Sequence, residues 1–127
     1  MAMDFSASDE QVDPTTHVVA VRGEIDIFTA PEFKERVNGA IDAGRDYVIV
    51  DLSGTTFIDS SSLGVLISAH RRLRNRDGRL IVACDVTAVL STFKITGLDA
   101  VLEVVADRAA ALAARDAPAP PPGQATA

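Results

Sequence analysis

Short runs of branched apolar residues alternate along this chain with segments whose apolar residues recur at helical spacing. Residues 47–52 and 80–84 are almost continuously apolar, as expected of strands covered on both faces of a sheet. Each run precedes a stretch whose apolar residues lie three and four positions apart. Because helices commonly join neighbouring parallel strands, this alternation predicts an α/β fold.

The remaining elements follow the same pattern. Two strands near the N-terminus are expected to pair as a hairpin with an antiparallel edge, and a further strand is expected late in the chain; these strands cover residues 3–8, 17–22 and 101–105. Helices are expected at residues 29–44, 61–76, 85–97 and 107–115. The sequence therefore predicts a mixed, mostly parallel sheet of four to five strands packed with about four helices.

Several residues give specific signals for helix ends. Thr29 and Glu32 have the spacing of a capping box. Asp85 and Asp107 are each expected to cap the helix that follows. Gly97 suits the position just past the end of the third helix.

The length and the C-terminal composition indicate how the chain is organised. A chain of 127 residues is long enough for one buried core and too short for two domains. Residues 116–127 are mostly Ala and Pro, with little to bury and several missing backbone donors. We therefore expect one domain over residues 1–115 and a disordered tail over residues 116–127.

The net charge and the cysteine content indicate which classes of partner and which cellular compartment to expect. A formal net charge of −6 argues against nucleic acid or an anionic membrane surface as a partner. Cys84 is the only cysteine, and the N-terminus lacks the basic end and apolar run of a secretory signal. No apolar run approaches the roughly 20 residues that span a bilayer. A cytoplasmic protein with no membrane partner is expected.

The segment with the most candidate functional side chains is Asp59-Ser60-Ser61-Ser62, where the second helix is expected to start. Each of these four residues can cap a helix, and one cap is enough. A hydroxyl in the first turn of a helix is well placed to carry a phosphate, which adds about −1.5 to −2 charges. The segment is either a cap with spare hydroxyls or a phosphorylation site.

Two carboxylates precede the first helix. Glu24 and Asp26 lie two positions apart, so on an extended chain their side chains point to the same side. If they face Asp59, the surface is acidic and suits a basic partner or a magnesium ion. The alternative is a pair of solvated charges at a strand end. We expect a protein partner there, and neither a metal nor a cofactor.

Several motifs, in the same order, resemble the anti-sigma factor antagonists with a STAS domain. The motifs occupy residues 22–26, 30–32, 48–52, 57–66 and 95–98, and the resemblance covers roughly residues 3–114. It implies that the domain binds an anti-sigma factor that is also a serine kinase and thereby releases a sigma factor for transcription. Phosphorylation by the kinase ends the binding, and a serine phosphatase restores it.

The resemblance also implies roles for individual residues. By position, Ser61 is the phosphate acceptor, with Ser60 and Ser62 as alternatives, because the family commonly has glycine at the position of Ser62. The residues implied in partner binding are Glu24, Asp26, Asp59, Ser60, Ser62, Leu63 and Gly64. The domain is expected to be a monomer or a weak dimer.

Other functions compete with this one. STAS domains also serve as accessory subunits of membrane lipid transporters or as parts of signalling assemblies. A phospho-aspartate receiver would need a lysine near the end of the last strands, whereas Lys34 and Lys94 both fall in expected helices. A serine hydrolase would need a histidine base, and neither His17 nor His70 is suitably placed. We therefore expect a binding protein and no enzyme.

Overall fold

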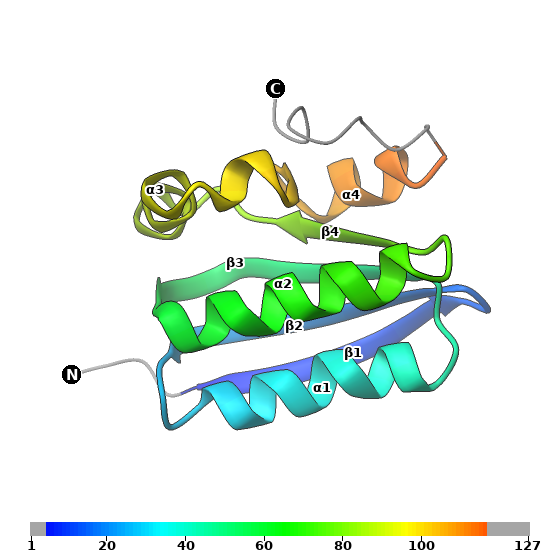
Figure 1. Cartoon of the computed structure of the whole chain (residues 1–127), viewed down its shortest axis with the longest axis horizontal. Coiled ribbons are helices and arrows are strands. Elements are labelled where there is room, and N and C mark those ends of the chain that lie inside the picture. The colour runs from blue at the N-terminus through cyan, green and yellow to red at the C-terminus, as the bar shows by residue number, and fades with distance from the viewer. Residues whose placement is uncertain (1–4, 117–127) are drawn as a thin grey trace.

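A five-stranded sheet, with its strands in sequence order, forms the centre of the computed structural model, which describes residues 5–116 (Figure 1). The strands are β1 (Ser6–Asp13), β2 (Thr16–Ile25), β3 (Tyr47–Ile58), β4 (Arg79–Ala83) and β5 (Glu103–Val105). β1 pairs antiparallel with β2, and the other three pairs are parallel. The predicted α/β class and the antiparallel hairpin edge are confirmed.

Helices cover both faces of this sheet. They are α1 (Ala30–Asp42), α2 (Ser60–Arg74), α3 (Thr87–Thr96) and α4 (Arg108–Ala114), with a short 3-10 turn, η1 (Leu98–Ala100), before β5. α1 and α2 lie side by side along the sheet (Figure 1), and their apolar residues share one core with those of α3. Ala111 of α4 belongs to the core on the opposite face.

The strand register explains the apolar runs of the sequence. Successive residues of a strand point to opposite faces, and the pairing aligns them in rows across β2, β3 and β4. One row, Val19, Val50 and Val82, packs with α1, α2 and α3. The next row, Val18, Ile49 and Ile81, packs with α4. Burial on both faces is why these strands lack the alternation of a half-exposed strand.

β3 is longer than predicted. The sequence predicts a strand over residues 47–52, but β3 continues through the polar residues after Leu52 to Ile58 and pairs with β2, with two irregularities in register. Thr55 is fully buried, and its hydroxyl donates to the carbonyl of Val21 at 3.0 Å. Long-range pairing therefore outweighs the local preference of these polar residues for a loop.

The other predicted strands also differ at their ends. β1 extends past the expected residues 3–8 to Asp13, because it pairs with β2 as far as the turn. β2 extends past the expected residues 17–22 to Ile25, because its end pairs with β3. Residues 3 and 4 of the first predicted strand lie outside the described residues. Of the five residues predicted for the last strand, only the last three form β5, since the chain before them forms η1 and a turn.

Two of the predicted helix signals are confirmed and two are wrong. Gly97 ends α3 with φ 77°, and the side chain of Asp107 accepts a hydrogen bond from the backbone of Ala110 at 2.8 Å. Asp85 does not cap α3, because the helix starts one residue later and has no side-chain cap. Thr29 occupies the cap position of α1 without capping it, since its hydroxyl bonds elsewhere.

α4 ends at Ala114, and the expected end of the domain at residue 115 stays a prediction. The expected disordered tail lies outside the described residues, apart from residue 116. Among residues 5–116, no helix is long and apolar enough to cross a membrane.

Candidate functional site at the start of helix α2

Asp59 alone organises the first turn of α2. Its backbone is extended, and its carboxylate accepts a hydrogen bond from the backbone N–H of Ser61 at 3.0 Å. Its carbonyl accepts from the N–H groups of Ser62 and Leu63 at 3.2 and 3.3 Å. Because Asp59 satisfies these donors, none of the three serines is needed as the helix cap.

The three serines have different surroundings. Ser60 is exposed, Ser61 is partly buried, and Ser62 is fully buried. The Ser62 hydroxyl donates to the carbonyl of Ile25, the last residue of β2, at 3.2 Å. Within residues 5–116, the hydroxyls of Ser60 and Ser61 make no protein hydrogen bond. Two of the hydroxyls are therefore open to modification, and the third belongs to the packing of α2 against β2.

Asp26 forms a tight turn between β2 and α1. Its carboxylate accepts hydrogen bonds from the backbone N–H groups of Phe28 at 2.9 Å and Thr29 at 3.1 Å, and these bonds lower the pKa of Asp26. The Thr29 hydroxyl donates to the carbonyl of Glu24 at 3.0 Å and accepts from the backbone of Asp26 at 2.9 Å. The extended strand assumed for both carboxylates ends at Ile25, so it includes Glu24 but not Asp26. That the two carboxylates lie together stays a prediction.

Large apolar side chains are exposed beside this turn. Ile27 and Phe28 are 67 % and 87 % exposed, and Phe57 of β3, which lies opposite Glu24 in the strand register, is 48 % exposed. Sequence reasoning missed this feature, although two large apolar residues directly before a helix cap could have indicated it. Exposed apolar groups that are held in place by a turn are typical of a protein-binding surface.

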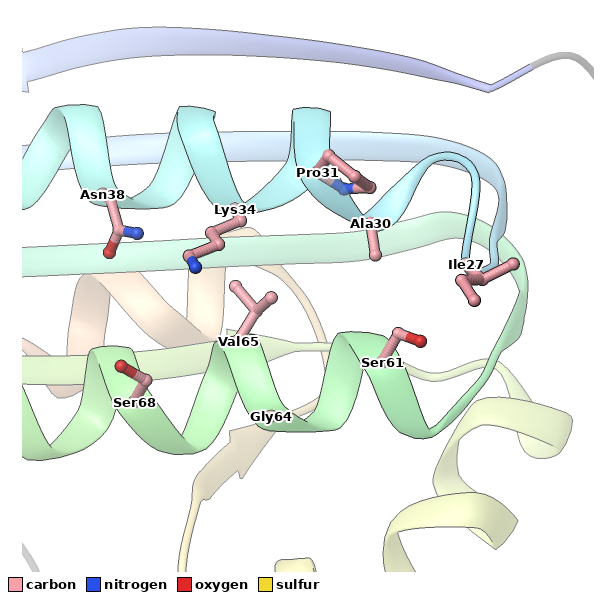
Figure 2. A pocket seen from close by; sticks show the side chains of 9 residues that line it. All are labelled: Ile27, Ala30, Pro31, Lys34, Asn38, Ser61, Gly64, Val65 and Ser68. Atoms are coloured by element: carbon pink, nitrogen blue, oxygen red, sulfur yellow. The ribbon is translucent and has the colours of Figure 1, made fainter.

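An open groove of roughly 480 Å³ separates α1 from α2 (Figure 2). Lys34 and Asn38 line it from α1, and Ser61, Gly64 and Ser68 line it from α2. Ile27 lies at the end of the groove where Ser61 is, and the Ser61 hydroxyl points toward that end (Figure 2). The groove therefore joins the serine to the exposed apolar turn.

The residues expected to bind a partner do not all reach this surface. Asp59 and Glu24 are partly exposed, and Gly64 is exposed. Leu63 is only 7 % exposed and, like Ser62, it lies in the core. Sequence spacing could not separate these residues, because four consecutive positions point in all directions around a helix.

The sequence model of the STAS domain matches residues 7–111 of the chain. This chain belongs to the STAS domain family. This chain is 33 % identical over 91 residues to the anti-sigma-B factor antagonist of Listeria monocytogenes. The aligned region covers 71 % of this chain and 80 % of that relative. The family expected from the motifs is therefore confirmed.

Solved structures agree with this fold. An anti-sigma factor antagonist from Mycobacterium paratuberculosis superposes with a TM-score of 0.81 at 27 % identity, covering 89 % of this chain and 96 % of that chain. The anti-sigma factor antagonist SpoIIAA in its unphosphorylated form gives a TM-score of 0.74 at 24 % identity, covering 87 % of this chain and 96 % of that chain.

Within the described residues, no histidine lies beside Ser61. His17 contacts Asp9 at 3.1 Å, at the opposite end of β2 from the serines. His70 lies on α2 about 13 Å along the axis from Ser61, and burial lowers its pKa, with a further effect from the neighbouring arginines. Over the same part of the chain, no group of three or more His, Cys, Asp or Glu side chains is arranged to hold a metal ion.

Proposed function

We propose that this STAS domain is an anti-sigma factor antagonist whose binding is controlled by phosphorylation of Ser61. The unphosphorylated domain binds a serine-kinase anti-sigma factor in the cytoplasm and so frees a sigma factor. The observation that carries the proposal is the Ser61 hydroxyl, which is partly exposed and makes no protein hydrogen bond within residues 5–116. The names of the relatives support the class of partner.

The surroundings of the three serines favour Ser61 as the acceptor. Ser62 is fully buried, so a kinase would reach its hydroxyl only if α2 separated from β2. Ser60 is exposed but does not line the groove, whereas Ser61 does. In the transfer, a bond forms between the serine oxygen and the γ-phosphorus of ATP, the bond to ADP breaks, and the hydroxyl proton is released.

The partner surface combines apolar anchors with carboxylates. Ile27 and Phe28 offer exposed apolar area that the turn of Asp26 holds in place. Glu24 and Asp59 add negative charge nearby, on a chain with a formal net charge of −6. Such a surface fits a partner with an apolar pocket and a basic rim.

A phosphate on Ser61 would change this surface without unfolding the domain. It adds about −1.5 to −2 charges next to Ile27, where the partner docks. Bacillus SpoIIAA, whose fold this chain shares, has been solved in both unphosphorylated and phosphorylated forms. A serine phosphatase would then remove the phosphate and restore binding.

Affinity for the cognate anti-sigma factor tests the proposal. Ser61→Ala should bind as tightly as the wild type and keep binding when ATP is added, whereas Ser61→Asp should bind roughly tenfold more weakly or worse, equal to about 1.4 kcal/mol. Ser91→Ala, at an exposed serine of α3, is the matched control and should behave as the wild type. Thermal melting should show all three variants folded. Equal affinities of Ser61→Ala and Ser61→Asp would contradict the proposal.

A further inference from the structure

Lys34 is the charged residue among those lining the groove that contains Ser61 (Figure 2). Its side chain extends from α1 into the groove, with its ammonium group on the side of Val65 away from Ser61, and that group makes no hydrogen bond or ion pair within residues 5–116. Most other cations near α1 are engaged, since Arg36 contacts Asp9 at 2.8 Å and Arg72 contacts Asn38 at 3.0 Å. A free cation therefore faces the same groove as the modifiable serine.

The start of α2 provides few groups to hold a phosphate. The N–H groups of Ser61, Ser62 and Leu63 already donate to Asp59. The carboxylate of Asp59 also places a negative charge beside Ser61, which repels an added phosphate. A phosphate on Ser61 would thus meet the carboxylate of Asp59 and needs a cation from elsewhere.

We propose that Lys34 pairs with the phosphate on Ser61 across the groove between α1 and α2. The flexible four-carbon stem of lysine allows its ammonium to swing from Val65 toward the start of α2. Val65 lies between Lys34 and Ser61 in Figure 2, and Gly64, which also lines the groove, adds no side chain to it. An ammonium paired with a dianionic phosphate makes charge-assisted hydrogen bonds, which are stronger than neutral ones.

This pairing rests on the proposed function, which supplies the phosphate on Ser61. It adds a second effect to the change of charge on the partner surface. The phosphate does more than place charge on the partner surface. It occupies the groove and engages Lys34, so both become unavailable to a docking partner. The unphosphorylated and phosphorylated domains then differ in the shape of the groove as well as in charge.

The test is the pKa of the phosphate itself, measured by phosphorus NMR on the full chain with phosphoserine inserted at position 61 during translation. An unperturbed phosphoserine titrates near pH 6. Lys34→Gln should raise the midpoint by roughly 0.2 to 0.7 unit relative to the wild type, as expected for an exposed ion pair. Lys34→Arg should keep the lower midpoint, and added salt should reduce the difference.

Lys94→Gln is the matched control, because Lys94 is the chain's other lysine and lies on α3. It should leave the midpoint unchanged. Identical midpoints for the wild type and Lys34→Gln, or an equal shift in Lys94→Gln, would overturn the pairing. The inserted phosphoserine needs no kinase, so a kinase that ignores Ser61 would contradict the proposed function alone. Identical midpoints would remove only the role of Lys34.

Discussion

The carboxylate of Asp59 accepts a hydrogen bond from the backbone N–H of Ser61 at 3.0 Å, so the residue that caps α2 is not the residue proposed to carry the phosphate. This division of roles leaves the Ser61 hydroxyl free within residues 5–116 while the helix start stays satisfied. A change at Ser61 can therefore alter the surface without weakening the fold.

Replacing Asp59 should weaken the fold through loss of the cap. Asp59→Ala should lower the free energy of unfolding by about 1 kcal/mol, because the N–H of Ser61 loses its acceptor. Asp59→Asn should retain most of the stability, since an amide oxygen can also accept. Urea denaturation measures the free energy of unfolding of both variants. An unchanged free energy of unfolding in Asp59→Ala would show that the cap does not stabilise the fold.

The buried serine and the exposed serine should respond differently to the same substitution. Ser62→Ala removes the hydrogen bond to the carbonyl of Ile25, which still accepts from the backbone of Asp59 at 3.1 Å, so the cost should be about 1 kcal/mol. Ser60→Ala should change stability by less than about 0.5 kcal/mol. Thermal melting compares the pair, and the reverse order of stabilities would contradict the assigned positions.

Tyr47 should make stability fall at high pH. Burial raises its pKa to about 12, and its hydroxyl donates to the carbonyl of Ala111 in α4 at 3.0 Å. Because the folded pKa is above the unfolded value of about 10, this contribution is fully present below pH 10 and is lost as the pH rises through about 12.

Ultraviolet absorbance titration reports on Tyr47 alone, since the chain has one tyrosine and no tryptophan. A midpoint near 10 in the folded protein would contradict the burial of this hydroxyl. Tyr47→Phe should remove the titration and cost about 1 kcal/mol of stability from the lost hydrogen bond.

Acid should loosen the turn that holds Phe28. The hydrogen bonds from the backbone of Phe28 and Thr29 lower the pKa of Asp26, so their stabilisation is present above the unfolded value of about 3.9. It is lost as the pH falls through the lower folded pKa. The amide shift of Phe28 in NMR should therefore titrate below pH 3.9, and Asp26→Asn should abolish that step. A step at or above 3.9 would contradict the turn geometry.

The sequence carried enough information for the layers of this fold but not for every strand end. Apolar runs such as residues 80–84 predict a buried strand because burial on both faces requires them. The continuation of β3 past Leu52 depends on pairing with β2, which no local pattern of polar residues reveals. Asp85 fails as a cap for a related reason, since the packing of α3 decides where the helix starts.

The candidate site was predicted in outline only. The segment at residues 59–64 was located correctly at the start of α2, because several helix-capping residues precede an apolar helix. Which serine is buried depends on the carbonyl of Ile25, a contact between distant residues. The exposure of Phe28 likewise depends on the turn of Asp26, where the chain leaves the extended geometry assumed for β2.

The most direct test of the account incubates the full chain with its cognate anti-sigma kinase and ATP, and follows the phosphate by mass spectrometry while the complex is monitored. We expect one phosphate on Ser61, none on Ser62, and dissociation of the complex in step with phosphate uptake. Phosphate on another residue, or full modification of Ser61 with the complex intact, would contradict the account.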